Sequence, residues 1–446
     1  MIYDVIIIGA GAAGLFAGAS MTGPVKGLII EKSSSPGKKL LMSGAGQCNL
    51  TRGGSIKDFI PHYGKNGPQI RSILYRFNNQ NLIDFFQSRN VPLFERGDGK
   101  IFPKSLQSHE VLHCLVDSCI NNSLKFIYSS PVTGISLENT KEKALNSEDN
   151  VIHTAESKKS NTNVTYDLNS KEPTSIYSVY CGKIFYQTRK LIVTSGGCSY
   201  PASGSDGKLF NILKNMGIQI NPTSPALVPI HIYDYPFQNL SGISFPKASI
   251  SIYSRSYESK IAEARDALLL THNCFSGPAI LNISRYAWPE DLISINYYPL
   301  KSKDLICKEL SKLIVGNSKQ LITILYEYFN SGLSKSTVDI PKRFLEVICS
   351  RCNADPGQKS SQVSYTILKS ITNLMANDTY CIQNLGGYNI AMVTSGGVSL
   401  DEVDKKTLES KIYPNLYFAG EVLDVDGDTG GYNLQFAFSS GNLVAQ

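Results

Sequence analysis

Residues 3–15 read Tyr3-Asp4-Val5-Ile6-Ile7-Ile8-Gly9-Ala10-Gly11-Ala12-Ala13-Gly14-Leu15. An apolar, β-branched run is followed by three glycines and then by a second apolar run, which is the order strand, tight turn, helix. The Gly-x-Gly-x-x-Gly spacing lets the backbone turn sharply, approach a pyrophosphate and pack a helix against a sheet. The segment therefore predicts the start of a dinucleotide-binding α/β domain.

A second buried strand is expected at residues 27–31. It ends at Glu31, 22 residues after Gly9, which is about the separation at which an acidic side chain accepts hydrogen bonds from the adenosine ribose. The helix that follows Gly11 would meet the phosphates with its N-terminus, where unpaired N–H groups and the helix dipole stabilise an anion. The glycine spacing is shared by FAD and NAD sites, so it does not choose between them.

Length and charge limit the classes of protein to consider. A chain of 446 residues exceeds one ordinary core, so we expect two or three domains. Its net charge of +6 suits an anionic cofactor and falls short of a nucleic-acid footprint, so we expect a small-molecule substrate and no nucleic-acid partner. The glycine motif begins too early to leave room for a signal peptide, and no long apolar run predicts a membrane span. We expect a cytoplasmic protein, and its oligomeric state stays open.

The ten cysteines are expected to be free thiols. Cys114 and Cys119 have the spacing of flavin disulfide reductases, but they lie in a predicted amphipathic helix at 108–122. Cys349 and Cys352 form a Cys-x-x-Cys pair without a second pair or paired histidines nearby. We therefore expect buried helix cysteines and no metal site.

The chain after Glu31 alternates glycine-rich loops with regular elements. Residues 36–49 contain a basic pair and a glycine-rich loop that can lie along a cofactor. Helical spacing follows at 69–90, a hairpin at 96–103 and a strand at 124–128. Residues 138–178 are polar, with few aliphatic side chains, and predict a mobile loop or loose hairpin.

Two short strands are expected at 183–186 and 190–194, and the second ends at the glycine pair 196–197. Prolines between residues 222 and 229 mark a domain boundary. A last strand ends at Gly420-Glu421, and a helix is expected at 432–445. These elements would close the first domain with the C-terminus of the chain.

The predicted fold class is α/β, a discontinuous Rossmann-like dinucleotide-binding domain with inserted subdomains, in which the resemblance described below implies FAD as the dinucleotide. Residues 1–222 form its first part and residues 374–446 its C-terminal part. Between them, residues 223–300 predict a β-rich, barrel-like subdomain and residues 301–373 a helical subdomain.

The chain resembles the BaiN-like (YhiN-type) NAD(P)/FAD-dependent oxidoreductases, flavoproteins of the glutathione-reductase-like FAD fold class. The resemblance covers nearly the whole chain except residues 138–178. Its motifs are GAGAAG at 9–14, PGKKLLMSGAGQCN at 36–49, GKIFPKS at 99–105, SGGCSYPASGSDG at 195–207, LTHNCFSGPAIL at 270–281 and LYFAGEVLDVDGDTGGYNLQ at 416–435. It implies non-covalent FAD as the cofactor, with NAD(P)H as a transient reductant.

The resemblance also implies which residues bind FAD. The glycine loop would face the pyrophosphate, Glu31 the ribose, the Val132 backbone the adenine, and Glu421 a ribityl hydroxyl. A helix N-terminus at residues 431–434 would meet the pyrimidine edge of the flavin, where the reduced flavin gathers negative charge. The expected FAD-binding residues are Gly9, Gly11, Ala12, Ala13, Gly14, Glu31, Lys32, Lys39, Ser43, Gly44, Cys48, Asn49, Val132, Thr194, Gly196, Gly197, Gly420, Glu421, Gly431, Tyr432, Asn433 and Leu434.

The chain departs from the family pattern at two places. Gln47 stands where family members commonly have arginine, which removes a positive charge near the flavin. Leu209-Phe210 replaces the usual Gly-Tyr-like continuation and would reshape the mouth of the pocket.

The predicted function is an FAD-dependent oxidoreductase in which flavin N5 exchanges a hydride with a small organic substrate and NAD(P)H donates the electrons. Tyr200 and His272 are the candidates for proton transfer. The alternatives are a flavin-dependent amine oxidase, a flavin-dependent RNA-modifying protein and a non-catalytic flavin redox sensor. A basic face with aromatic side chains on the inserted domains would favour the RNA-modifying protein.

Overall fold

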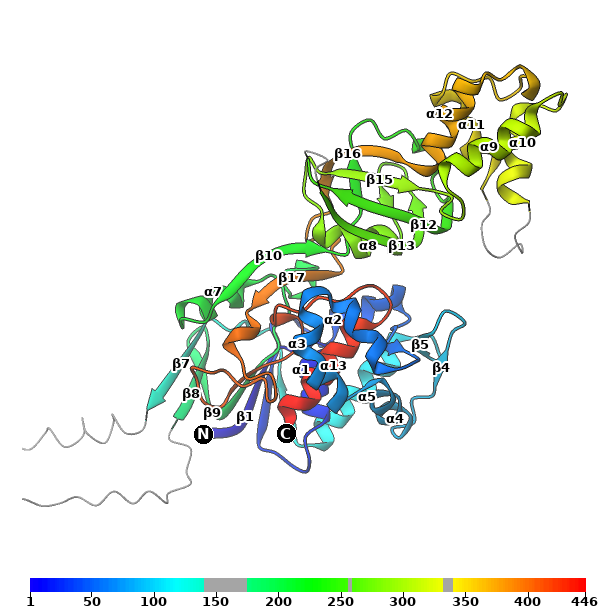
Figure 1. The fold of residues 1–446 in the computed structure, drawn as a ribbon. Coiled ribbons are helices and arrows are strands. Elements are labelled where there is room, and N and C mark those ends of the chain that lie inside the picture. The colour runs from blue at the N-terminus through cyan, green and yellow to red at the C-terminus, as the bar shows by residue number, and fades with distance from the viewer. Residues whose placement is uncertain (140–174, 256–258, 332–339) are drawn as a thin grey trace, which may run out of the picture. The chain divides into compact units, whose positions relative to one another are not determined.

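The computed structural model describes residues 1–139, 175–255, 259–331 and 340–446 (Figure 1). These residues form two units. Unit 1 contains Met1–Pro222 and Gly396–Gln446, and unit 2 contains Thr223–Ser395. The second unit is thus inserted into the first along the chain.

Unit 1 is built on a seven-stranded sheet in the order β6-β2-β1-β9-β8-β7, with β18 also beside β9. The strands are β1 (Ile2–Ile8), β2 (Gly27–Ile30), β6 (Leu124–Ile127), β7 (Gly134–Asn139), β8 (Ser175–Cys181), β9 (Ile184–Val193) and β18 (Leu416–Phe418). β6, β2, β1, β9 and β18 are parallel, whereas β7 and β8 are antiparallel additions. The predicted Rossmann-like fold class is confirmed.

The apolar residues of the opening motif form the centre of this sheet. Val5–Ile8 are buried, and Ile6 pairs with Leu28 on one side and Leu191 on the other. Parallel sheets bury both faces, which explains the continuous apolar run. Two helices, α1 (Ala12–Ala19) and α13 (Tyr432–Ala445), pack together although they lie at opposite ends of the chain (Figure 1).

Two local predictions need correction. The strands expected at 183–186 and 190–194 are one strand, β9, because the buried Thr188 continues the pairing to both Tyr3 and Tyr177. The polar segment 138–178 begins and ends within paired strands, where Glu138 lies opposite Ile176. Its residues 140–174, to which the mobile-loop prediction refers, lie outside the described residues.

The other elements of unit 1 cover this sheet or extend it. They are the helices α2 (Lys38–Met42), α3 (Gly67–Arg76), α4 (Asn79–Gln87), α5 (Ser108–Asn121) and α7 (Lys208–Asn215), and a small antiparallel sheet of β3 (Thr51–Arg52), β5 (Lys100–Pro103) and β4 (Leu93–Glu95). α5 spans almost the helix that the sequence predicted, and its Cys119 is buried against α1.

Unit 2 contains a closed barrel of six strands in the order β11-β14-β13-β12-β15-β16. These are β11 (Ile230–Ile232), β12 (Ser244–Tyr253), β13 (Lys260–Leu270), β14 (Phe275–Ser276), β15 (Leu292–Asn296) and β16 (Asp378–Leu385). The helices of unit 2 are α8 (Pro278–Ile283), α9 (Lys303–Ile314), α10 (Leu321–Asn330), α11 (Lys342–Arg351) and α12 (Tyr365–Ala376). Phe344 of α11 packs against Phe245 and Tyr297, so barrel and helices share one core.

The insertion ends later than the sequence suggested. The C-terminal part of the FAD domain was expected from residue 374, but β16 lies between β15 and β11 in the barrel, and unit 2 continues to Ser395. β10 (Ile220–Ala226) and β17 (Val393–Val398) pair where the chain passes between the units. Among the described helices, none has the length and apolar character needed to cross a bilayer.

Candidate functional site

The predicted cofactor residues of unit 1 gather at the carboxyl ends of β1, β2, β9 and β18. The Ala10 N–H donates to Glu31 Oε2 at 2.7 Å, which joins the first two strands. Thr194, directly after β9, donates its hydroxyl to the Gly9 carbonyl at 3.0 Å. Ligands of open α/β sheets bind at this edge.

The three motif glycines have different surroundings. A Cβ at Gly9 would lie 2.6 Å from the Thr194 carbonyl oxygen, and a Cβ at Gly14 would lie 2.0 Å from the Gly9 oxygen, so protein atoms exclude side chains at both. A Cβ at Gly11 would meet no atom within 4 Å, and its φ of −83° suits any residue. The space beside Gly11 is therefore open, and it adjoins the N-terminus of α1, which has no side-chain cap.

Glu31, the residue expected to meet the adenosine ribose, is held by several backbone groups. Its second carboxylate oxygen accepts from the Ser33 N–H at 2.7 Å, and its carbonyl accepts from the Ser130 N–H at 3.0 Å. The latter bond brings the segment containing Val132 to the end of β2. Lys32 forms an ion pair of 2.7 Å with Asp206. Burial alone would raise the pKa of Asp206, but bonds from Lys32 and from the Lys208 N–H lower it.

Glu421 is held by two side chains from distant segments. Lys39 Nζ lies 2.6 Å from Glu421 Oε2, and Ser199 donates to Oε1 at 2.5 Å. Lys39 also donates to Ser199. The preceding Gly420 has a φ of +74°, and a Cβ there would lie 2.6 Å from that of Ala13. Gly196 and Gly197, which the sequence predicted, lie on the same loop as Ser199. Sequence reasoning missed Ser199 itself.

The loop 43–49 combines positive φ angles with buried polar groups. Gly44 and Cys48 have φ values of +56° and +59°. Burial raises the pKa of the Cys48 thiol to about 12, although a bond with Ser43 opposes the shift, so the thiol stays protonated at neutral pH. The buried Asn49 Oδ1 accepts no hydrogen bond within the described part of the chain.

Gln47 has a guanidinium beside it despite the missing arginine. Its Oε1 accepts from Arg96 Nη2 at 2.9 Å, and the Arg96 guanidinium lies over the Phe102 ring. An arginine of the β4–β5 hairpin therefore lies beside Gln47. Sequence separation hid this contact.

The N-terminus of α13 presents backbone N–H groups of Tyr432, Asn433 and Leu434. Gly431 begins the helix with a φ of +102°, and a Cβ there would lie 2.8 Å from the Thr51 backbone. No side chain caps this end. The Asn433 side chain instead exchanges two 2.8 Å bonds with the Gly427 backbone.

A histidine that the sequence did not single out lies beside this helix end. His62 Nδ1 lies 2.8 Å from Asp428 Oδ2, and its ring stacks on Tyr432 with centroids 4.1 Å apart. His62 belongs to a 3₁₀ segment, Ile56–Asn66, with no catalytic motif, and 366 residues separate it from Asp428. No sequence signal could have joined them.

The two predicted proton-transfer residues belong to different units. Tyr200, in unit 1, has a φ of +52°, and its carbonyl accepts from Ser203. His272 is exposed between β13 and β14 of unit 2. Neither unit by itself contains both.

The cysteines are described by their pairing and burial. All ten are free, and no group of three or more potential metal ligands exists among the described residues. Burial raises the pKa of Cys119 and of Cys349 to about 12, which agrees with inert helix thiols.

Comparisons with known proteins agree with this architecture. The HI0933-like protein Rossmann domain matches residues 3–158 and 146–446. Ribosomal RNA dihydrouridine synthases of Escherichia coli (strain K12) and Haemophilus influenzae are 29% and 28% identical, covering 100% and 99% of this chain and 97% of each relative. A 3-dehydro-bile acid delta(4,6)-reductase of Clostridium scindens is 26% identical, covering 99% of this chain and 97% of the relative. Because the family match covers nearly the whole chain, the protein belongs to the HI0933-like Rossmann-domain family and is an FAD-dependent oxidoreductase, the class that its motifs predicted.

Proposed function

We propose that this protein reduces a carbon–carbon double bond conjugated with a carbonyl group, and that its substrate is a uracil ring in ribosomal RNA. The observation that carries the proposal is the chemistry common to the relatives' names. Forming dihydrouridine saturates the double bond of uracil, and a delta(4,6)-reductase saturates double bonds of an oxidised bile acid. Two of the three relatives act on ribosomal RNA by name.

The residues of unit 1 suit FAD. The space beside Gly11 can take the pyrophosphate, and the buried Asn49 Oδ1 is an acceptor for a donor such as the flavin N3–H. When bound, FAD would supply a hydride at N5. The residues expected to hold it are those of the glycine loop, Glu31, the loops at 43–49 and 194–197, Glu421 and the N-terminus of α13.

The chain's own groups would favour the reduced flavin. The N-terminus of α13 has no side-chain cap, and its helix dipole would stabilise nearby negative charge, by about 0.3–1 kcal/mol at an exposed helix end and more when partly buried. Lys39 and Ser199 fix both oxygens of Glu421, so this carboxylate is oriented before a ribityl hydroxyl arrives. Orientation in advance avoids reorganisation during the reaction.

Reduction of the double bond also needs a proton at the carbon next to the carbonyl. We propose His62 as its source, because Nδ1 is engaged by Asp428 and Nε2 can hold the transferable proton. The His62 side chain is 39% exposed, so substrate can reach it. Tyr200 and His272 remain the alternative acids.

NAD(P)H is the proposed electron donor, and a ribosomal RNA substrate fits the cytoplasmic location expected from the sequence. The mild net charge argued against a nucleic-acid partner. We now favour one, because two of the relatives are named for acting on ribosomal RNA.

The test uses the purified FAD-loaded protein, reduced without oxygen. Ribosomal RNA lacking the modification should restore the oxidised flavin spectrum, and mass spectrometry should find uridines that have gained two hydrogens. A 3-oxo-Δ4 steroid serves as the competing alkene. Reoxidation by the steroid alone would reject the RNA substrate, and reduction of the oxidised flavin by an amine would indicate an amine oxidase. No turnover with any of them would favour a redox sensor.

A further inference from the structure

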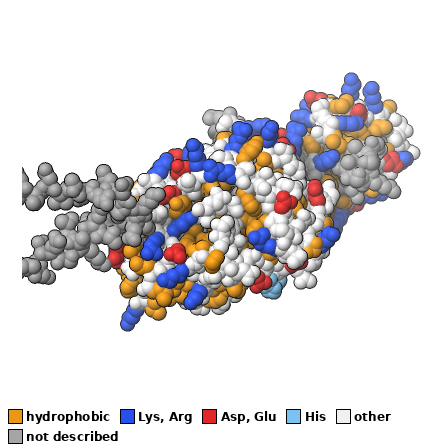
Figure 2. All heavy atoms as spheres, turned by 90° about the horizontal axis from the view of Figure 1, so that it is seen from below, with side chains coloured by type: hydrophobic (Ala, Val, Ile, Leu, Met, Phe, Trp, Pro, Cys, Tyr) orange, Lys and Arg blue, Asp and Glu red, His pale blue; other side chains and the backbone are white. Residues whose placement is uncertain are grey.

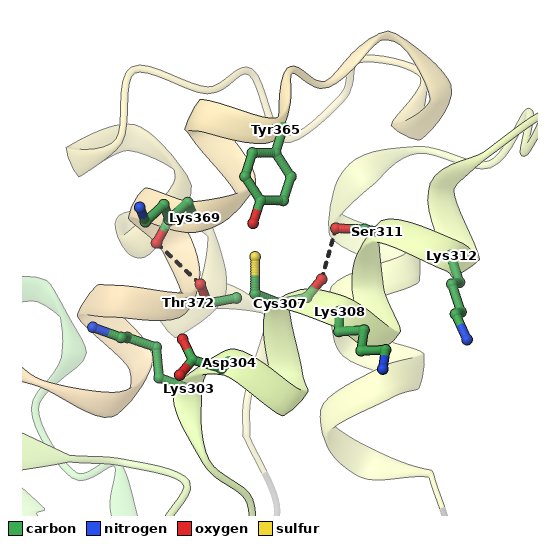
Figure 3. A pocket seen from close by; sticks show the side chains of 9 residues that line it. All are labelled: Lys303, Asp304, Cys307, Lys308, Ser311, Lys312, Tyr365, Lys369 and Thr372. Atoms are coloured by element: carbon green, nitrogen blue, oxygen red, sulfur yellow. Dashed lines mark hydrogen bonds between the residues drawn. The ribbon is translucent and has the colours of Figure 1, made fainter.

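The helical part of unit 2 has an open groove of about 460 Å³ between α9 and α12. This volume lies within the ~300–1,000 Å³ range of ligand pockets. Four lysines line the groove, and all four are exposed: Lys303, Lys308, Lys312 and Lys369 (Figure 3). Asp304 is the one acidic residue among the lining residues.

The lysines of this groove differ from others nearby in their pairing. Lys301 and Lys319 form ion pairs with Glu309 and Glu327 at 2.6 Å and 2.9 Å. Within the described ranges, no ion pair neutralises the lysines that line the groove, and Lys303 only reaches an amide oxygen of Asn373 at 3.4 Å. Lys312 lies close enough to Glu309 to help lower the pKa of that carboxyl, so the charges of Lys303, Lys308 and Lys369 are the least compensated.

An aromatic ring completes the groove. Tyr365, the first residue of α12, is 64% exposed, and its hydroxyl points to the buried thiol of Cys307 (Figure 3). This contact holds the ring while leaving its surface accessible. Exposed aromatic rings beside cationic side chains are the usual platform for unpaired bases.

The charge of the chain is concentrated in this region. Residues 301–376 contain 11 Lys and Arg against 6 Asp and Glu, a net charge of +5, whereas the whole chain carries +6. On the face drawn in Figure 2, Lys and Arg are scattered among acidic and apolar side chains.

We propose that the α9/α12 groove binds a single-stranded segment of RNA, with phosphates on its four lysines and a base on the Tyr365 ring. The proposal rests on the RNA substrate proposed above and assigns a second contact to it, on unit 2. A lone small anion would not need an aromatic platform, and a chain of phosphates matches lysines spread over two helices.

The test measures binding of a fluorescein-labelled oligouridylate to the FAD-loaded protein by anisotropy at several salt concentrations. The variant K308Q/K312Q/K369Q should bind about tenfold more weakly or worse. Its slope of log affinity against log salt should fall by about 2, because each phosphate contact on a single strand contributes ~0.7. The matched control is K319Q/K342Q/K359Q, which removes the same charge from lysines outside the groove and should keep most of the slope.

A second pair of variants tests the ring. Tyr365→Ala should weaken binding roughly 5- to 100-fold, the range expected when one stacked base is lost. Tyr365→Phe keeps the ring, loses only the contact to Cys307 and should bind like the parent. Melting temperatures check that each variant folds.

The outcomes separate this inference from the proposed function. If ribosomal RNA is reduced but the groove variant binds oligouridylate like the control, the groove assignment is wrong. If binding depends on the groove lysines but no RNA is reduced, the groove stands and the proposed function fails. Binding of anionic phospholipid vesicles, without binding of oligouridylate, would overturn the assignment in favour of a lipid surface.

Discussion

Gly11 and Gly14 belong to one motif, yet different atoms require them. Gly14 is required by the protein, because its missing Cβ would overlap the Gly9 carbonyl. Gly11 borders open space, and its φ angle is one that any residue adopts. The protein alone would therefore accept a side chain there. The motif predicts both glycines, but only the structure separates the folding requirement from the ligand requirement.

Gly11→Val should therefore leave folding unchanged and weaken FAD binding. The valine side chain would occupy the space proposed for the pyrophosphate, and we expect at least a tenfold loss of affinity, about 1.4 kcal/mol. Flavin titration of the apoprotein measures the affinity, and the melting temperature of the apoprotein measures folding. Gly14→Val is the matched variant and should lower that melting temperature. An unchanged FAD affinity in Gly11→Val would place the pyrophosphate elsewhere.

His62 gives a second prediction for a single residue. His62→Gln should slow the reoxidation of reduced flavin by the alkene substrate about 10²- to 10⁴-fold, the usual contribution of a general acid. Flavin reduction by NAD(P)H should keep its rate, because that step needs no proton from His62. Stopped-flow absorbance separates the two half-reactions, with His113→Gln, an exposed histidine of α5, as the control. Equal reoxidation rates in both variants would return the acid role to Tyr200 or His272.

The residues that the sequence missed share one property. Ser199, Arg96 and His62 act through partners that are 222, 49 and 366 residues away. Motif spacing is a local signal, so it finds glycine loops and helix ends, whose function depends on the backbone. It cannot find side chains that meet only after folding.

At the scale of elements, helix α11 is fixed to the barrel by a buried ion pair. Arg351 donates to both oxygens of Asp378 on β16, at 2.7 Å and 2.8 Å, and the Asp378 side chain is fully buried. The Tyr297 and Tyr380 hydroxyls also donate to this carboxylate. Helix α11 and the last barrel strand are thus joined through one carboxylate.

Arg351→Met should destabilise unit 2 by about 3 kcal/mol, because it leaves Asp378 buried without a counterion. Urea denaturation followed by tryptophan fluorescence reports on this unit, since the single tryptophan of the chain is Trp288. Arg343→Met, at an exposed position of the same helix, should change stability by less than about 0.5 kcal/mol. Similar stabilities for the two variants would show that the ion pair contributes nothing net.

Periodicity predicted the elements better than their partners. The helices at 108–122 and 432–445 nearly coincide with α5 and α13, because long amphipathic or capped patterns identify helices well. The sequence predicted two strands in place of β9, because the polar residues at its centre resemble a break. In the structure, β9 pairs with β1 on one side and β8 on the other through this polar centre. The place of β16 in the barrel depends on pairing with β11, which lies about 150 residues earlier, and no local pattern encodes it.

At the scale of the whole molecule, both ends of the chain build one cofactor domain. β1 and α1 come from the first residues, and β18 and α13 come from the last. The glycines at both ends predicted this closure, because each follows a strand and precedes a helix. The groove of the insertion could not be predicted, since lysines on two helices form no sequence motif.

The last prediction follows from the number of dinucleotide sites. After Gly14 the sequence has no second Gly-x-Gly-x-x-Gly that follows a strand, and in the described ranges the parallel sheet of unit 1 is the one sheet of Rossmann type. A nicotinamide therefore has no domain of its own, and we expect it to take turns with the acceptor at the flavin.

Such alternation predicts ping-pong kinetics. Double-reciprocal plots against NAD(P)H at several fixed acceptor concentrations should give parallel lines, and NAD(P)H should reduce the flavin with no acceptor present. A long RNA substrate would change this pattern. If it is anchored on the α9/α12 groove, it could stay bound there while its target base leaves the flavin and NAD(P)H enters. Parallel lines with a short uridine substrate and intersecting lines with long ribosomal RNA would fit that anchoring. Intersecting lines with both substrates would require a separate nicotinamide site, and failure of both nicotinamides to reduce the flavin would mean that another donor supplies the electrons.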